Sequence, residues 1–234
     1  MPSEIRDASM LEHWSQQIAS FRQTIPEHVR IIAVTKKKSV TAIEAAAAAG
    51  VYDIGESQVQ EAMQKHRQIS DHLPNLNWHL IGRLQSNKVR KALAIFDWIH
   101  SVDSLKLAQT IDRISQELDR APPQLCLQVK LEADPQKTGW ASEALIEQLP
   151  LLDRLEHVEI RGLMVIPPFG LDNAKTQAIF QAAKSLQTTI QSQAWQHLRM
   201  DQLSMGMSND YQAAIAQGAT MIRPGRVLFG DRDH

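Results

Sequence analysis

The sequence has little cysteine, almost no excess charge and no long apolar run. Cys126 is the single cysteine, so no internal disulfide can form, and its apolar neighbours predict a buried thiol in a reducing compartment. The formal net charge of -1 gives no indication of a nucleic-acid surface or a polybasic membrane patch. No window approaches a membrane span, and the polar amino terminus is unlike a signal peptide. We therefore expect a soluble, cytoplasmic protein.

Several common functional signatures are also missing. The nine histidines have no paired metal-ligand spacing, which predicts that no metal is bound. The sequence contains no G-x-S-x-G motif, no P-loop and no G-x-G-x-x-G motif, so the usual nucleophile elbow and nucleotide-binding loops are not indicated. With 43% hydrophobic and 22% charged residues, the 234-residue chain nevertheless has the composition of an ordinary globular protein with a large core.

Short apolar runs alternate with helical segments along the chain. Several runs are continuous, as in residues 31–34, which is typical of parallel strands covered on both faces. Eight strands alternating with helices predict a single α/β domain over residues 1–234, a (β/α)8 TIM barrel. The expected strands are 29–35, 52–55, 77–81, 98–102, 124–131, 159–166, 202–204 and 220–228, and the expected helices include 10–24, 41–49, 58–69, 104–118 and 174–191.

The helix expected at residues 10–24 precedes the first strand, and only six residues follow the last one. A barrel of this type needs an outer helix after each strand. We therefore expect the amino-terminal helix to take the place of the eighth outer helix, and we expect no second domain.

Lys36 is the first candidate for chemistry, because functional residues of such barrels lie at the carboxyl ends of the strands. If Ile32 and Val34 point into the barrel, the two-residue period of a strand places Lys36 inside as well. Partial burial and the nearby charge of Lys38 would lower the pKa of this amine and favour Schiff-base chemistry. A run of three lysines is also typical of a solvated strand end, and spacing alone leaves both interpretations open.

The carboxyl-terminal strands indicate an anion site. Ser204 and Ser208 lie where the seventh strand passes into a short helix, and free N–H groups at a helix start favour phosphate. Arg223 and Gly225 follow the eighth strand, a place where barrels frequently hold phosphate. Ser208 is equally explained as an ordinary N-cap, and the two interpretations are compatible. His79 is expected near the mouth of the third strand, although a lone histidine there is more often a core residue.

Short segments in a fixed order resemble the YggS/PROSC family, the pyridoxal-phosphate homeostasis proteins, along nearly the whole chain. Any one segment is a weak signal, but seven or more in the right order are specific. They are AVTK at 33–36, IGE at 54–56 with VQE at 59–61, WHLIG at 78–82 with LQSNK at 84–88, HSVDS at 100–104, KTG at 137–139, RGLM at 161–164, LSMGMS at 203–208 and FG at 229–230.

The resemblance implies a fold-type III barrel, similar to the amino-terminal domain of alanine racemases, that binds pyridoxal 5′-phosphate. Lys36 matches the lysine that forms the internal aldimine. Ser208 and Gly225 match positions that hold the phosphate, and Arg223 matches the arginine that faces the pyridine nitrogen. Ser204, in the same turn as Ser208, is expected to contribute to the phosphate site.

His79 completes the expected cofactor-binding residues, and no residue is assigned a catalytic role. The chain departs from the family pattern at three positions. Ser57 stands where an asparagine is usual, Arg83 where a proline is frequent, and Arg226 where a threonine is typical. Loss of that threonine hydroxyl, with a new positive charge, is expected to change phosphate affinity without affecting the role of Lys36.

The function implied by the resemblance is homeostasis of pyridoxal phosphate and of amino and keto acids. An arginine at the ring nitrogen keeps the ring neutral, which weakens carbanion chemistry and favours carrying the cofactor over turnover. We expect a monomer that passes the cofactor to acceptor apoenzymes, with Lys137 as a second amine during release. A slow pyridoxal-phosphate-dependent amino-acid racemase is the main alternative, and a barrel enzyme that acts on a phosphorylated sugar is another.

Overall fold

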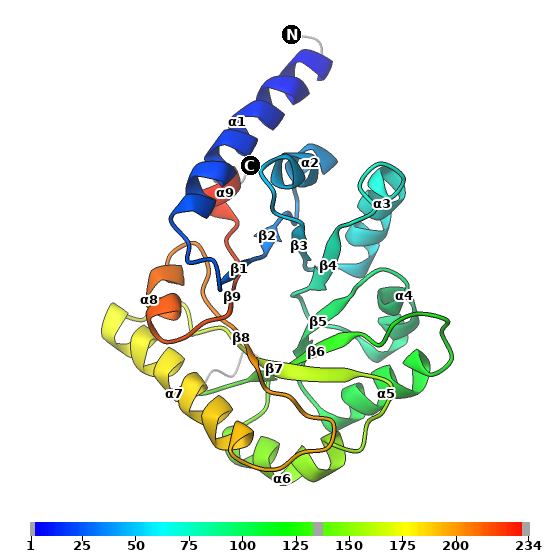
Figure 1. Cartoon of the computed structure of the whole chain (residues 1–234), viewed down its shortest axis with the longest axis vertical. Helices are drawn as coiled ribbons and strands as arrows, with labels where there is room; N and C mark the ends of the chain where they lie inside the picture. Colours follow the sequence, from blue (N-terminus) through cyan, green and yellow to red (C-terminus); the bar gives the residue numbers. More distant parts are fainter. Residues whose placement is uncertain (1–2, 133–137, 231–234) are drawn as a thin grey trace.

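The computed structural model describes residues 3–132 and 138–230 of the chain. Parallel strands form a ring, and helices surround it (Figure 1). The strand order is β1-β9-β8-β7-β6-β5-β4-β3-β2. The strands are β1 (Arg30–Ile31), β2 (Ala33–Val34), β3 (Asp53–Glu56), β4 (Asn77–Leu80), β5 (Trp98–Val102), β6 (Gln124–Val129), β7 (Glu159–Val165), β8 (Gln202–Ser204) and β9 (Met221–Ile222).

The sheet closes because β1 and β2 are two halves of one stretch of extended chain. Only Ile32 separates them, and its N–H donates to Ile222 O at 2.9 Å. β1 pairs with β9, and β2 pairs with β3, so this stretch joins the two ends of the sheet. The result is the (β/α)8 barrel that the sequence predicts, and every pair of neighbouring strands in it is parallel.

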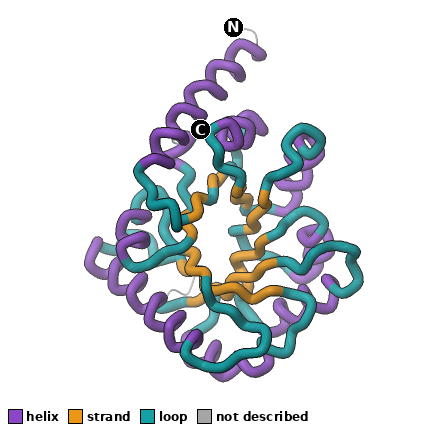
Figure 2. The backbone as a smooth tube through the Cα atoms, viewed as in Figure 1, coloured by secondary structure: helices purple, strands orange, loops and turns teal. Residues whose placement is uncertain are grey.

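The helices lie outside the ring of strands, as the tube in Figure 2 shows. Ser104 caps α5 through a bond from Leu107 N at 3.3 Å, which confirms the predicted helix start. The helices are α1 (Ser3–Gln23), α2 (Val40–Ala48), α3 (Val59–Ile69), α4 (Val89–Leu93) after the short 3-10 helix η1 (Ser86–Lys88), α5 (Leu105–Ser115), α6 (Ser142–Leu152), α7 (Asn173–Gln191), α8 (Tyr211–Ala216) and α9 (Arg226–Phe229).

The prediction of the eighth strand was wrong at its carboxyl end. The structure has a strand only at β9, and the apolar residues that follow belong to the one-turn helix α9. Between them lies Pro224, which cannot donate a ladder hydrogen bond, and Gly225 begins the turn. A short apolar run does not distinguish a strand from a helical turn, so the sequence alone merged the two.

Apolar side chains form two separate layers, one inside the ring and one between the ring and the helices. Ile32 lies inside, whereas its neighbours Ile31 and Ala33 face the helices, as the two-residue period requires. Burial raises the pKa of the inner Cys126 thiol to about 12, so this cysteine is an inert packing residue. The inner cluster consists of Ile32, Trp98, Cys126, Met164 and Met221, with Ile166 packed against it.

Helix α1 packs against α2 and α9, in the place expected for an eighth outer helix. Its Trp14 ring meets Phe229 of α9 edge-on at 5.6 Å, and Gln17 Nε2 donates to Val227 O at 2.8 Å. The first turns of α1 project beyond the barrel (Figure 1). None of the helices among the described residues is long and apolar enough to span a membrane.

Candidate functional site

Lys36 lies at the carboxyl end of the ring, two residues beyond β2. Val34 N donates to Pro224 O at 2.9 Å, so the chain that carries Lys36 runs directly beside the turn that carries Gly225. An added Cβ on Gly55 would touch both Ile32 and Val34, which places these two side chains on the inner side of the ring. Lys36 is half-buried at the next position of the same parity. The structure thus brings Lys36 and Gly225 to one mouth of the barrel.

Ser208 does not cap the following helix, which corrects one of the two interpretations offered for it. The residue at the start of α8 is Asp210, and Ser208 lies two residues earlier. Its hydroxyl instead accepts hydrogen bonds from two backbone N–H groups, Gly225 N at 3.1 Å and Val227 N at 3.3 Å. These two donors point at one oxygen, which is the arrangement that binds an anionic oxygen.

The turn between β8 and Ser208 depends on Gly206. Its φ is 93°, in the left-handed region, and an added Cβ would lie 2.6 Å from Cβ of Ala214. Gly206 O also accepts from Arg223 N at 2.8 Å. This bond ties the turn to the chain beyond β9 and holds Ser208 over the Gly225 turn.

Arg223 is the buried cation of the site. Arg223 is only 4% exposed. Both described hydrogen-bond acceptors of its guanidinium group are neutral. Nη1 donates to Ser204 Oγ at 2.6 Å, and Nη2 donates to Val165 O at 2.9 Å. Burial lowers the pKa of Arg223 to about 10, which leaves the guanidinium charged at neutral pH.

His79 and Ser204 belong to a hydrogen-bonded series that crosses the inside of the barrel, here called the inner chain. Asp53 Oδ1 lies 2.8 Å from His79 Nε2, and His79 Nδ1 lies 2.9 Å from His100 Nε2. His100 Nδ1 lies 2.8 Å from Ser204 Oγ, which is bound to Arg223. Asp53 begins β3 and Arg223 follows β9, so the inner chain runs from the amino end of the ring to the mouth.

The two ends fix the direction of every hydrogen bond in the inner chain. Arg223 can only donate, and an ionised Asp53 can only accept. The Ser204 hydroxyl therefore donates to Nδ1 of His100. Nε2–H of His100 then donates to Nδ1 of His79, whose Nε2–H donates to Asp53. Both imidazoles are neutral in this assignment, and burial lowers the pKa of His79 and lowers that of His100 well below its usual value.

A second buried polar cluster lies on the other side of the strand, between β3 and α3, and is here called the outer triad. It consists of Glu56, Glu61 and Lys65. Lys65 Nζ donates to Glu56 Oε1 at 2.7 Å, to Glu61 Oε1 at 2.8 Å and to Thr35 O at 2.8 Å. Burial raises the pKa of Glu56, whose Oε2 is buried without a hydrogen-bond partner. Lys37 N donates to Glu61 Oε1 at 2.5 Å.

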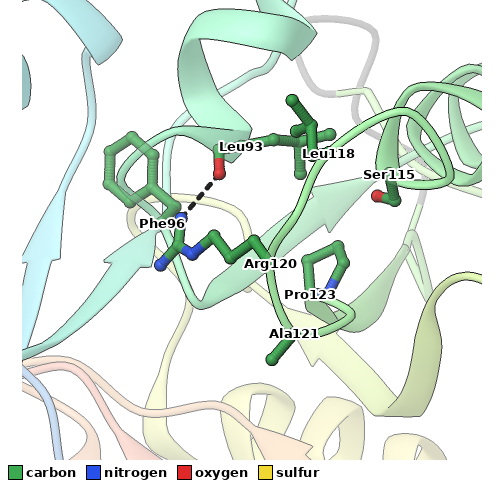
Figure 3. Close-up of a pocket in the computed structure, with 7 residues that line it drawn as sticks. All are labelled: Leu93, Phe96, Ser115, Leu118, Arg120, Ala121 and Pro123. Atoms are coloured by element: carbon green, nitrogen blue, oxygen red, sulfur yellow. Dashed lines mark hydrogen bonds between the residues drawn. The ribbon is translucent and has the colours of Figure 1, made fainter.

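A small pocket is lined by other residues. Phe96 and Pro123, which line it (Figure 3), precede β5 and β6, so the pocket is at the amino end of the ring, opposite the mouth. Arg120 Nη1 donates to Leu93 O across it at 2.6 Å. It contains none of the predicted site residues, and the chemistry at the carboxyl ends of the strands outweighs its shape.

The positions that depart from the family pattern lie at the rim. Arg83 and Arg226 are exposed, and Ser57 is half-buried. Arg226 is the first residue of α9, next to the Gly225 N–H group. Lys137 lies outside the described residues.

Five polar residues of the two clusters were not recognised as site residues from the sequence. The signal for His100 was its parity with Trp98 in β5, because alternate residues of a strand share a face and Trp98 is in the inner cluster. The other four are Asp53, Glu56, Glu61 and Lys65.

The chain is similar to known proteins over most of its length. Residues 10–233 match the family described as "Alanine racemase, N-terminal domain". The chain is 49% identical to the pyridoxal phosphate homeostasis protein of Synechocystis over 209 residues, which cover 89% of this chain and 94% of that protein. It is 35% identical to the Escherichia coli protein of the same name over 211 residues, 89% of this chain and 88% of that protein.

Solved structures give the same result. The structure of PipY of Synechococcus elongatus with PLP bound matches with a TM-score of 0.88 and 51% identity, over 93% of this chain and 100% of that chain. An alanine racemase of Clostridium difficile matches with a TM-score of 0.75 and 15% identity, over 97% of this chain and 60% of that chain, which shows a shared fold alone. The chain therefore belongs to the family of pyridoxal phosphate homeostasis proteins, built on the alanine racemase amino-terminal fold.

Proposed function

We propose that this chain binds pyridoxal 5′-phosphate at the mouth of the barrel, holds it covalently on Lys36 and carries it without turnover of a substrate. The observation that carries the proposal is the meeting of an amine, two convergent N–H donors and a buried cation at one mouth. When bound, the cofactor supplies an aldehyde that condenses with a primary amine with loss of water, together with a phosphate and a basic ring nitrogen.

The residues fit a phosphate at Ser208 and Gly225. The N–H groups of Gly225 and Val227 converge on the Ser208 hydroxyl, which lies at the half-buried rim of the mouth. A phosphate oxygen accepts from such donors more strongly than a neutral hydroxyl oxygen does, because its charge assists the hydrogen bond. We assign these groups to the phosphate, with Arg226 as an additional charge at the rim.

The residues also fit a ring nitrogen at Arg223. Its described acceptors are neutral, so an additional electron pair would compensate a buried positive charge. The guanidinium stays charged at neutral pH and opposes protonation of a neighbouring base. In this proposal Arg223 keeps the ring neutral, while Ser204 and His79 act behind it and fix its orientation. Ser204, expected from the sequence at the phosphate, is therefore assigned to Arg223 instead.

Carrying is favoured over the racemase alternative by the similarity in sequence. The chain is 49% identical to the Synechocystis homeostasis protein over 94% of that protein, whereas its likeness to the C. difficile racemase, at 15% identity, is one of fold alone. Turnover is tested by incubating the loaded protein with each common amino acid in deuterated solvent. We expect no exchange of the α-hydrogen, and exchange would establish the racemase-type activity instead.

The first experiment compares the visible absorption of the wild type with that of Lys36→Ala after addition of pyridoxal 5′-phosphate. We expect a yellow band in the wild type, its loss on borohydride reduction, and covalent label on the peptide that contains Lys36. Lys37→Asn is the matched control, because asparagine tolerates the left-handed φ of 61° at that position. A wild type that stays colourless and unlabelled would refute the proposal.

We extend the proposal to a monomer in the cytoplasm that passes its cofactor to acceptor apoenzymes. Sedimentation of the loaded protein tests the oligomeric state. If Lys137 takes part in release, Lys137→Ala should slow transfer of the cofactor to an acceptor apoenzyme. An unchanged transfer rate would show that Lys137 has no role in release.

A further inference from the structure

We propose that the outer triad positions Lys36 for covalent capture of the cofactor aldehyde, with Glu61 as the positioning residue that fixes the turn. This inference rests on the proposed function, because it concerns how the amine of Lys36 is aimed. Glu61 acts through the backbone on either side of Lys36.

The triad binds both chain neighbours of Lys36. On the amino-terminal side, Thr35 O accepts from Lys65 Nζ at 2.8 Å, and Thr35 Oγ1 donates to Glu56 Oε1 at 2.7 Å. On the carboxyl-terminal side, Lys37 N donates to Glu61 Oε1 at 2.5 Å. The backbone on both sides of Lys36 is therefore hydrogen-bonded to the outer triad. These two backbone contacts share the Lys65 ammonium group, which binds Thr35 O directly and Lys37 N through Glu61.

These backbone contacts hold a turn that is unfavourable by itself. Lys38 N donates to Thr35 O at 3.0 Å, which closes a turn with Lys36 and Lys37 at its centre. Lys37 has a φ of 61°, a left-handed conformation that is unfavourable for a residue with a side chain. The bond from Lys37 N to Glu61 supports this conformation, and the turn reverses the chain immediately after Lys36.

The triad is well suited to fixing a position. Lys65 is 6% exposed and uses its three ammonium protons on three acceptors in three directions. The acceptors come from the strand end, from α3 and from the turn, so the ammonium group fixes these three elements relative to one another. Charge-assisted hydrogen bonds of this kind are short and directional.

The groups that we assign to the phosphate lie in a different part of the structure. Ser208, Gly225 and Val227 belong to the segments around β9, whereas the outer triad lies between β3 and α3. Bond formation requires the amine to approach the aldehyde in a defined geometry, and a displacement near 1 Å can cost up to about 100-fold in rate. Loss of Glu61 is therefore expected to slow capture while phosphate binding is retained.

The test separates capture from binding. Pyridoxine 5′-phosphate has the same ring and phosphate but an alcohol in place of the aldehyde, so it reports binding alone. The variants are Glu61→Ala, which removes the acceptor, Glu61→Gln, which keeps an acceptor oxygen, and Glu61→Asp, which withdraws it. Glu117→Ala is the control, because Glu117 forms an exposed ion pair with Arg113 elsewhere.

Three quantities are measured for each variant. They are the rate of borohydride-trapped label at Lys36, the Kd for pyridoxine 5′-phosphate, and hydrogen exchange of the Lys37 amide in the ligand-free protein. In Glu61→Ala we expect capture at least about tenfold slower, a Kd within about twofold of the wild type, and loss of Lys37 protection. Glu61→Gln should restore most of the capture rate, with Glu61→Asp intermediate.

The outcomes distinguish this inference from the proposed function. A wild type that binds pyridoxine 5′-phosphate but never labels Lys36 overturns the proposed covalent function, and the inference with it. A wild type that labels normally, beside a Glu61→Ala protein with unchanged capture, overturns the inference alone. Equal losses of capture and of pyridoxine 5′-phosphate binding would indicate a merely structural role and also overturn it.

Discussion

The inner chain and the outer triad are two buried polar clusters on opposite faces of the same barrel wall, and they accommodate charge in opposite ways. The inner chain has charged groups at its ends and neutral groups between them, and each neutral group donates one hydrogen bond and accepts another. The outer triad gathers two carboxyl groups around one ammonium group. The inner chain fixes the orientation of a guanidinium, whereas the outer triad fixes the position of a turn.

This comparison predicts which truncations are costly. A buried ion pair that loses one partner leaves an uncompensated charge, which is far worse than a lost neutral hydrogen bond. The outer triad should therefore be the more sensitive of the two clusters in stability. Substitutions in the inner chain should instead have the larger effect on how stability depends on pH.

The largest effect is expected for Lys65→Met. It leaves the Glu56 and Glu61 carboxylates without their shared cation, and we expect the free energy of unfolding to fall by roughly 3–5 kcal/mol. Urea unfolding at neutral pH measures the change, with the exposed Lys91→Met as the control. Adding Glu56→Gln to Lys65→Met should recover part of the loss. A double variant no more stable than the single one would show that the unpaired charge is not the cause.

Ser204→Ala is expected to cost less, about 1–3 kcal/mol. The substitution removes the oxygen that lies between Arg223 Nη1 and His100 Nδ1, so two buried groups lose a partner. Ser101→Ala is a matched control, because Ser101 is also buried but donates a single bond, to Gly82 O at 2.7 Å. Equal losses in the two serine variants would mean that the inner chain is no more than a set of separate hydrogen bonds.

The inner chain also predicts a dependence of stability on pH. Burial lowers the pKa of His79 and of His100 below the unfolded value near 6.5, so below that pH the unfolded chain binds more protons than the folded one. Stability is then full above pH 6.5 and falls as the pH decreases, by at most about 1.4 kcal/mol per pH unit for each histidine. Glu56 acts with the opposite sign, because its pKa is raised.

Urea unfolding at pH 7.5, 6.5 and 5.5 measures this slope. His100→Gln removes one of the two titrating groups and should reduce the slope by one proton. His72→Gln, the same substitution at an exposed histidine, is the matched control. Equal slopes in the wild type and His100→Gln would show that the buried histidines do not titrate as the inner chain requires.

The sequence predicted the framework well, because local periodicity determines it. The continuous apolar strands, the helix start at Ser104 and the inward parity of Ile32 and Val34 all follow from spacing within a few residues. The failures have a different origin. The Ser208 hydroxyl binds N–H groups seventeen and nineteen positions away, and no local pattern distinguishes that from an N-cap.

The two polar clusters could not be predicted for related reasons. His100 and Ser204 are 104 positions apart and meet only because the barrel closes. Glu61 and Lys65 form an i,i+4 pair, which on a helix ordinarily indicates a solvated face. Here Lys65 also forms an ion pair with Glu56 of β3, so the i,i+4 pair faces the barrel wall. Glu56 is buried because α3 packs on β3, which no local pattern reveals.

The smallest effect is expected for Asp53→Asn, at the outer end of the inner chain. The asparagine Oδ1 can still accept from His79, and the Asp53 side chain is 17% exposed, so water compensates part of the change. We expect a loss below about 1 kcal/mol. The Asp53 carboxylate raises the pKa of His79 through its hydrogen bond and its charge, so a neutral amide there should lower this pKa further and extend the acid-sensitive window to lower pH, while its upper edge stays near pH 6.5. If Asp53→Asn costs as much as Lys65→Met, the charge of the inner chain is not confined to its ends, and the contrast between the two clusters fails.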